Sequence, residues 1–432
     1  MHVLATNPEL YGTLIEAQAI PLFITLLSHE NSDIVGATLN LLQELTDVDI
    51  LNESVEGAEQ LVRALLDARI VECIVASFAT LNETVKDDAD ALHNGLTVFE
   101  NILDFHPAFS QDCVQHGLFQ WLLKRATQRG TFDGNKMYAS EMLALLLQTS
   151  DAAREQLTAK VDGMELLLRA LASYKRHDPT SLDEREHMEN LFDGLCSSLL
   201  HPPNRKKFLD GEGLQLMNLM LRERKQSRES ALKVLDHATT GPEGKENCAK
   251  FVEILGLRTL FPLFMRTPAK EHVVAVLAAL LRSCDEESRQ RIMQKFAEHE
   301  HEKVDRAVEL FLKYRGKVDK FIQRQNKENT TPADKGDGDK MREYLDRLDG
   351  GLYTLQNVTL LLSDICVQLN SARQRAIKLF SMKVRQEKLS AHFIPILSEY
   401  AENLGETADE ERRRIDTFIA RLNAAEKAER KQ

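Results

Sequence analysis

Apolar residues recur along most of this chain with the spacing of amphipathic helices. Val35, Leu39, Leu42 and Leu45 are one example, because residues three, four and seven positions apart share one face of a helix. Each such helix follows a shorter apolar segment and a polar joint. The pattern therefore predicts helix pairs, each with one hydrophobic stripe that it cannot bury alone.

The helix pairs form a repeat. The shorter segments, typified by AIPLFITLL and GLQLMNLML, recur every 43 to 50 residues, starting at Ala19, Arg69, Gly117, Gly163, Gly213 and Gly256. The longer helices follow Asn31 and then begin at Ala89, Asn135, Glu186, Ser227 and Glu271. A period in the forties is typical of armadillo and HEAT arrays, in which stacked units share one continuous core. Helices that open at glycine, and a short joining helix around Pro202, favour armadillo.

We therefore predict an all-α fold, a right-handed superhelical armadillo (ARM/HEAT-like) solenoid with a C-terminal helical cap. About six units should fill residues 1–296, where the regularity weakens. A charged helix is expected over 297–325. The polar segment 326–341 contains glycine and proline without periodicity, and it predicts a flexible linker. Residues 342–432 should form further helices that cap the array.

Composition supports helix over sheet and gives no sign of export. The 432 residues include only 20 Gly and 11 Pro. The six cysteines form no CxxC pair, so we expect single buried thiols in a reducing compartment rather than a zinc site or disulfides. The N-terminus has no signal-peptide pattern, and the longest apolar run, Val273 to Leu281, is too short to span a bilayer. An intracellular protein without a membrane anchor is expected.

Charge is concentrated at one end of the chain. The net charge is −12, and residues 1–104 contain 18 acidic residues against three basic ones. Such a field would repel nucleic acid and attract a basic peptide, so direct nucleic-acid binding is not expected. Basic clusters elsewhere fall mainly in the joints between helices, which predicts solvated surface.

Patterns that would indicate catalysis or cofactor binding are missing. Gly211 and Gly213 match neither a dinucleotide fingerprint nor a phosphate-binding loop and are better interpreted as the start of a helix. The acidic run around Asp337 lacks the spacing of a calcium loop, and Glu298 to Glu302 contains no HExxH pair. We predict no enzyme activity, no cofactor, no metal and no small-molecule substrate.

Polar residues on the longer helices are the candidate binding residues, because that helix lines the concave groove of an armadillo array. Acidic side chains there would bind Lys and Arg, while side-chain amides hold an extended backbone; simple solvation is the alternative. The candidates are Asn40, Gln43, Glu44, Asp47, His93, Asn94, Glu100, Asn101, Asp104 and His237.

Longer stretches resemble a known family. ENLFDGLCSSLL, LLQELTDVD, GLFQWLLKR, SEYAENLG and the segment from Phe208 to Met265 closely resemble the beta-catenin-like family of nuclear armadillo-repeat proteins. The resemblance covers nearly the whole chain and is strongest from Glu189 to Met265. It implies a non-enzymatic nuclear scaffold of the pre-mRNA splicing machinery, in the Prp-nineteen and cell-division-cycle-five-like complex.

The resemblance also implies recognition of basic, nuclear-localisation-type segments of partner proteins, similar to importin-alpha. The groove ladder of Trp and Asn found in importin-alpha is not reproduced. Trp121 is the only Trp, and the Asn positions hold Glu44, Asn101, Leu146, a residue near Ser197, and His237. Acid pairing would therefore carry more of the recognition.

One alternative function and two open points remain. A karyopherin-like import adaptor would need an importin-beta-binding arm, which is not visible in the sequence. Met1 matches an internal position of the family, so we expect the family's N-terminal region to be missing from this chain. Self-association into a homo-oligomer is left open.

Overall fold

The computed structural model describes residues 5–159, 162–266, 271–328, 337–384, 388–405 and 408–429. In these residues every regular element is a helix and none is a strand, which confirms the predicted all-α fold. The chain divides into two compact units, Met1–Val234 and Leu235–Gln432. Each unit is a stack of helices in three layers.

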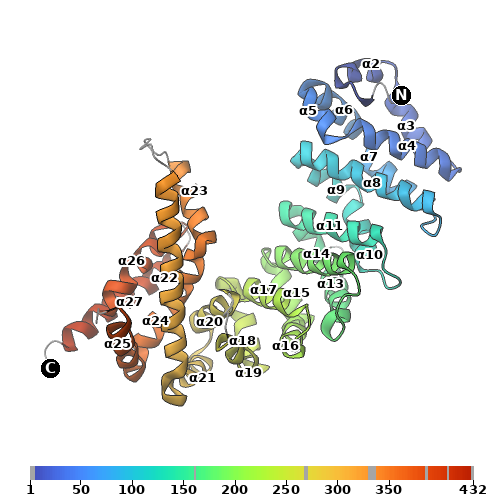
Figure 1. The fold of residues 1–432 in the computed structure, drawn as a ribbon. Helices are drawn as coiled ribbons and strands as arrows, with labels where there is room; N and C mark the ends of the chain where they lie inside the picture. Colours follow the sequence, from blue (N-terminus) through green and yellow to red (C-terminus); the bar gives the residue numbers. More distant parts are fainter. Residues whose placement is uncertain are drawn as a thin grey trace. The chain divides into compact units, whose positions relative to one another are not determined.

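In the first unit, each repeat consists of three consecutive helices (Figure 1). The repeats stack so that their first, second and third helices form three layers. The first layer contains α2 (Tyr11–Glu16), α6 (Val55–Asp67), α9 (Ser110–Gln115), α12 (Asp151–Ala159) and α15 (Pro202–Asp210). The second contains α3 (Ala19–Leu27), α7 (Ile70–Ser77), α10 (Leu118–Thr127), α13 (Gly163–Leu171) and α16 (Gly213–Glu223). The third contains α4 (Ser32–Leu45), α8 (Lys86–Phe105), α11 (Gly134–Thr149), α14 (Leu182–Ser198) and the beginning of α17 (Arg228–Thr239).

Short elements join these helices. They are α5 (Val48–Glu53) and the 3-10 turns η1 (Pro8–Leu10), η2 (Pro107–Phe109) and η3 (Ala172–Lys175). Equivalent helices pack on one another: α2 on α6, α3 on α7, α4 on α8, and α11 on α14. The stripe of Val35, Leu39, Leu42 and Leu45 is fully buried, as its spacing predicts. Stacking thus removes from water the hydrophobic faces that single helices would leave exposed.

The turn between the first and second helix of a repeat is tight and recurs. Its last residue before the second helix adopts a left-handed conformation, as at Arg69, Gly117 and Glu212. The next residue can approach the first helix closely: a Cβ on Gly213 would lie 2.3 Å from the ring of Phe208. Glycine is therefore required here for close packing, which explains why several second helices open at this residue type.

A buried asparagine ties neighbouring repeats together. Asn204, at the start of α15, is fully buried, and its Nδ2 donates to the carbonyls of Ser198 and Arg154, both at 2.9 Å. Ser198 ends α14 and Arg154 belongs to α12, so one side chain satisfies backbone acceptors on two helices. Backbone groups at helix ends need such partners because they have none within the helix.

The second unit repeats the same three-layer order. Its helices are α18 (Lys245–Glu253), α19 (Leu257–Phe264) and α20 (Glu271–Ser283), then α21 (Glu286–Ala297), α22 (Glu302–Glu328) and α24 (Tyr353–Gln368), and last α25 (Asn370–Val384), α26 (Leu389–Glu402) and α27 (Asp409–Glu429). The turns η4 (Pro242–Gly244) and η5 (His299–His301), helix α23 (Asp337–Arg347) and the π-helical turn η6 (Leu348–Leu352) complete it. The third helices α20, α24 and α27 pack in succession.

The stacking order continues past Phe296, where the sequence pattern weakens. Helix α22 takes the second-helix place, but it is 27 residues long, and α23 and η6 precede the third helix α24. The expected linker, 326–341, is helical at both ends, because α22 reaches Glu328 and α23 begins at Asp337. Its middle, 329–336, lies outside the described residues. The domain limits derived from the sequence stay predictions.

A buried carboxylate joins three helices of the second unit. Asp364 on α24 is 1% exposed at its side chain and forms ion pairs with Arg289 of α21 and Arg414 of α27. The Asp364–Arg414 distance is 3.0 Å, and Gln368 also donates to the carboxylate. Because a buried charge is costly without partners, these contacts hold the helices in one arrangement.

Candidate functional site

Polar side chains on α4 and α8 form a connected row. Asn40 donates from Nδ2 to Glu44 Oε1 at 2.9 Å, and Asn94 on α8 donates to Asn40 Oδ1 at 3.3 Å. Gln43 lies beside them, partly exposed. The hydrogen bond between Asn94 and Asn40 links two repeats, so the structure brings these sequence candidates together on the third layer.

The row continues from α8 to α11 through Tyr138. The rings of His93 and Tyr138 lie 4.8 Å apart, and the Tyr138 hydroxyl donates to the Glu100 carboxylate. Burial, and then this hydrogen bond, raise the pKa of Tyr138, so the hydroxyl keeps its proton and acts as the donor. Glu100 is thereby fixed in orientation.

Three carboxylates follow one another across three third-layer helices. They are Glu100 on α8, Glu141 on α11 and Glu186 on α14, and we call them the acidic row. Burial raises the pKa of Glu141 above its usual value, and the negative charges of Glu100 and Glu186 raise it further. Both neighbouring carboxylates are therefore close enough to act on Glu141.

Amide groups accompany the acidic row. The Nδ2 atoms of Asn101 on α8 and Asn190 on α14 are buried and have no hydrogen-bond partner within the described part of the chain. Buried amide donors are usually paired, and leaving one unpaired costs stability. Two such unpaired donors lie on the layer that holds the carboxylates.

The remaining candidates are placed differently. Asp47 caps α5, since its carboxylate accepts from the backbone N–H groups of Asp49 and Ile50. Asp104 is exposed near the end of α8. His237 is half-exposed on α17 and belongs to the second unit, so it is described apart from the acidic row.

Sequence reasoning missed four residues of this surface: Tyr138, Glu141, Glu186 and Asn190. A signal for the acids exists, because Glu100, Glu141 and Glu186 recur at nearly the repeat period. Aligning the third helices on their acidic positions, rather than on the importin-type Asn, would have found it.

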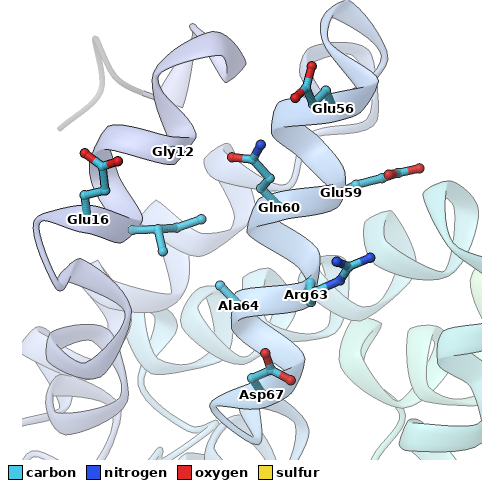
Figure 2. A pocket seen from close by; sticks show the side chains of 9 residues that line it. Gly12, Glu16, Glu56, Glu59, Gln60, Arg63, Ala64 and Asp67 are labelled. Atoms are coloured by element: carbon cyan, nitrogen blue, oxygen red, sulfur yellow. The ribbon is translucent and has the colours of Figure 1, made fainter.

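A second acidic surface lies between α2 and α6 (Figure 2). Its cavity measures about 520 Å³, and its lining includes four carboxylates, those of Glu16, Glu56, Glu59 and Asp67. Arg63 is the one basic residue in the lining. In Figure 2, Gln60 extends from α6 toward the helix that carries Glu16. This surface is formed by first-layer helices, whereas the acidic row belongs to the third layer.

Other kinds of site find little support in the described residues. No group of three or more His, Cys, Asp and Glu there could hold a metal ion. All six cysteines are free, and four of them are buried. No single described helix is long and apolar enough to cross a membrane; one pair, Pro8–Glu16 with Ala19–Leu27, passes that test together but is bent by 83°.

Stacked units of three helices, with a period in the forties and with equivalent helices packed in layers, define the class: an armadillo-repeat protein. The chain belongs to the family described as catenin-beta-like, Arm-motif containing nuclear, whose model matches residues 1–395. The resemblance expected from the sequence is therefore confirmed.

Individual relatives agree with this assignment. The chain is 48% identical over 423 residues to beta-catenin-like protein 1 of Homo sapiens, covering 94% of this chain and 74% of that protein. It is 32% identical over 418 residues to the beta-catenin-like protein 1 homolog of Schizosaccharomyces pombe, covering 94% of this chain and 71% of the homolog.

Two solved structures are also similar. One comes from a study of a phosphorylation switch that controls the interaction between cadherin and beta-catenin. Its TM-score is 0.41 and its sequence identity is 11%, and the match covers 93% of this chain and 91% of that chain. The other is importin beta, with a TM-score of 0.37 and 11% identity, covering 96% of this chain and 53% of that chain.

Proposed function

We propose that this protein is a non-enzymatic nuclear scaffold that binds basic, nuclear-localisation-type segments of partner proteins along its third-layer helices. The acidic row carries the proposal, because burial and then repulsion from the charges of Glu100 and Glu186 disfavour the ionised form of Glu141. A Lys or Arg side chain placed among them would remove that repulsion. Binding is thus favoured by relief of a cost already present in the free protein.

The helix spacing suggests how the partner would lie. Packed helices are separated by roughly 8–10 Å, and an extended chain advances about 3.3 Å per residue. Successive acidic residues would therefore meet side chains about three residues apart.

The cellular setting of the proposal rests on the family. Its members are described as nuclear, and the resemblance in the sequence implies a place in the pre-mRNA splicing machinery. We therefore assign the partner segments to proteins of the splicing complex. A basic segment is the chemistry that the acidic N-terminal part of the chain would attract.

A titration with two basic peptides tests this function. One peptide carries Lys or Arg at every third residue, and the other has the same composition with its charges clustered at one end. We expect the evenly spaced peptide to bind more tightly. The double variant Glu44→Lys, Glu100→Lys should weaken its binding about tenfold or more, because two attractive charges become repulsive.

The matched control is Glu59→Lys, which reverses one charge in the first-layer cavity of Figure 2. It should change the affinity by less than about twofold, since it acts only through the long-range field. If Glu59→Lys abolishes binding while the third-layer variant does not, the peptide occupies the first-layer cavity and the proposed binding surface is wrong.

A further inference from the structure

A cavity of about 500 Å³ in the first unit has a lining that contains none of the three carboxylates of the acidic row. It is enclosed by the loop after α10, the first turns of α11 and α14, and the end of α13 with η3. This size falls within the range of small-ligand pockets. Its chemistry is opposite to that of the surfaces described above.

Cationic side chains line this cavity. Arg129 and Lys136 lie in it and form no ion pair or side-chain hydrogen bond within the described residues, while Arg169 is paired with Glu165. Burial lowers the pKa of Lys136, and the nearby Arg125 guanidinium lowers it further. The one carboxylate in the lining, Glu184, already accepts hydrogen bonds from the backbone N–H and the hydroxyl of Thr180. Two cations of the lining, Arg129 and Lys136, thus have no ion-pair partner among the described residues, although the charges of Asp133 and Glu184 also act on Lys136.

A buried histidine completes the lining. His187 on α14 is 2% exposed, and its Nδ1 has no hydrogen-bond partner among the residues that the structure describes. Its ring forms a hydrogen bond with the backbone of Lys136, and burial lowers its pKa to about 4. The ring is therefore neutral at pH 7, with the proton on Nε2 and a free lone pair on Nδ1. Buried acceptors are usually paired, and a ligand in the cavity that His187 lines can supply the donor.

We infer that this cavity binds a phosphate monoester, with Lys136 and Arg129 on its anionic oxygens and its remaining P–OH donating to His187 Nδ1. The phosphate could be carried on a side chain of a partner protein or be a free phosphate compound. The cavity has room for the group that bears the phosphate.

Phosphate suits the site better than other anions for one chemical reason. A phosphate monoester has a second pKa near 6, so it keeps one O–H donor for part of the time at neutral pH. An ionised carboxylate or a sulfate has acceptors only. Either of these would require His187 to take up a proton at pH 7, well above its own pKa. The cavity should therefore distinguish phosphate from sulfate.

The same shared proton makes binding depend on pH. Phosphate binding should tighten as the pH falls from 7.5 to 6, because the complex holds one proton between the phosphate oxygen and Nδ1 of His187. The ionisable groups around His187 from each packed element are Lys136 on α11, Glu184 on α14, Arg169 on α13, Tyr174 on η3, and Arg129 and Asp133 in the loop.

The test uses the full chain and three probes: inorganic phosphate, sulfate, and a phosphoserine peptide paired with its unphosphorylated form. Binding is measured by calorimetry at pH 6.5. We expect phosphate to bind at least about tenfold more tightly than sulfate. Tighter binding of the phosphoserine peptide than of phosphate would identify a protein-borne phosphate, and the reverse order a free phosphate compound.

Three variants test whether phosphate binds in this cavity. Lys136→Met and Arg129→Ala should each weaken phosphate binding about tenfold. The matched control is Lys124→Met, which removes one exposed charge of α10 outside the cavity lining. Equal binding of phosphate and sulfate, equal loss in Lys124→Met, or no phosphate binding in the millimolar range would each overturn the inference.

Discussion

Replacement of Glu141 by Gln should stabilise the fold and weaken the binding of basic segments at the same time. The ionised Glu141 carboxylate is disfavoured by burial and by the charges of Glu100 and Glu186. Its pKa is therefore higher in the folded than in the unfolded chain. Such a carboxyl contributes stability below its unfolded pKa and loses that contribution as the pH rises through the folded pKa. At pH 7 the charge opposes folding, and Gln removes it.

The expected change in the free energy of unfolding follows from the two like-charged neighbours of Glu141. Pairs of like charges on partly exposed helix surfaces destabilise by roughly 0.2–0.5 kcal/mol each. Glu141→Gln should thus add about 0.4–1 kcal/mol to the free energy of unfolding at pH 7, or about 1–3 °C in Tm. The affinity for an evenly spaced basic peptide should fall about fivefold, which corresponds to about 1 kcal/mol from one lost charge pair in a partly exposed groove.

Thermal unfolding at pH 7 and pH 4, together with peptide titration at low and high salt, measures both effects. The gain in stability should vanish at pH 4 and shrink at high salt, where the repulsion is absent or screened. Glu155→Gln is the control, because it removes the same charge from the exposed surface of α12. A destabilised Glu141→Gln variant, or one with unchanged peptide affinity, would refute the role given to the acidic row.

Three further predictions concern the fold. Gly213→Ala should destabilise by about 1–3 kcal/mol in urea unfolding because its Cβ would overlap a phenyl ring, whereas Gly134→Ala, where a Cβ meets nothing within 4 Å, should not destabilise. Stability should fall as the pH drops from about 6.5 toward 4, because burial lowers the pKa of His187 to about 4 and the unfolded chain takes up the proton; His187→Phe should flatten this part of the curve. Asp364→Asn should lower the unfolding free energy by about 2–4 kcal/mol, since it leaves two arginines without their carboxylate, and unfolding monitored by circular dichroism measures it.

Much of the fold could be predicted from periodicity. The buried stripe from Val35 to Leu45 and the helix starts at Gly163 and Gly213 follow from helical spacing and from the need for close packing. The later repeats could not be predicted in the same way. Helix α22 is far longer than the other second helices, and α23 separates it from α24, so the period is interrupted although the packing order persists.

The binding surface was predictable only in part. Asn40, Glu44, Asn94 and Glu100 stand out as polar positions opposite an apolar stripe. Hydrogen bonds join Asn40 to Glu44 and, across one repeat, to Asn94, whereas Glu100 accepts from Tyr138. The repulsion at Glu141 depends on which residues of neighbouring helices come into register. That register is set by packing between repeats and cannot be read from one helix.

Layered stacking explains why the acidic row indicates a binding surface. Equivalent residues of successive third helices lie next to one another, so a charge of one sign at the same register is repeated at short distance and repels its neighbours. Packing does not require this, because apolar or uncharged residues would fill the same positions without repulsion. The unpaired amides of Asn101 and Asn190 add a second cost on the same layer. A linear chain with evenly spaced positive side chains would relieve the repulsion along the acidic row, because each positive charge pairs with carboxylates that otherwise face only one another.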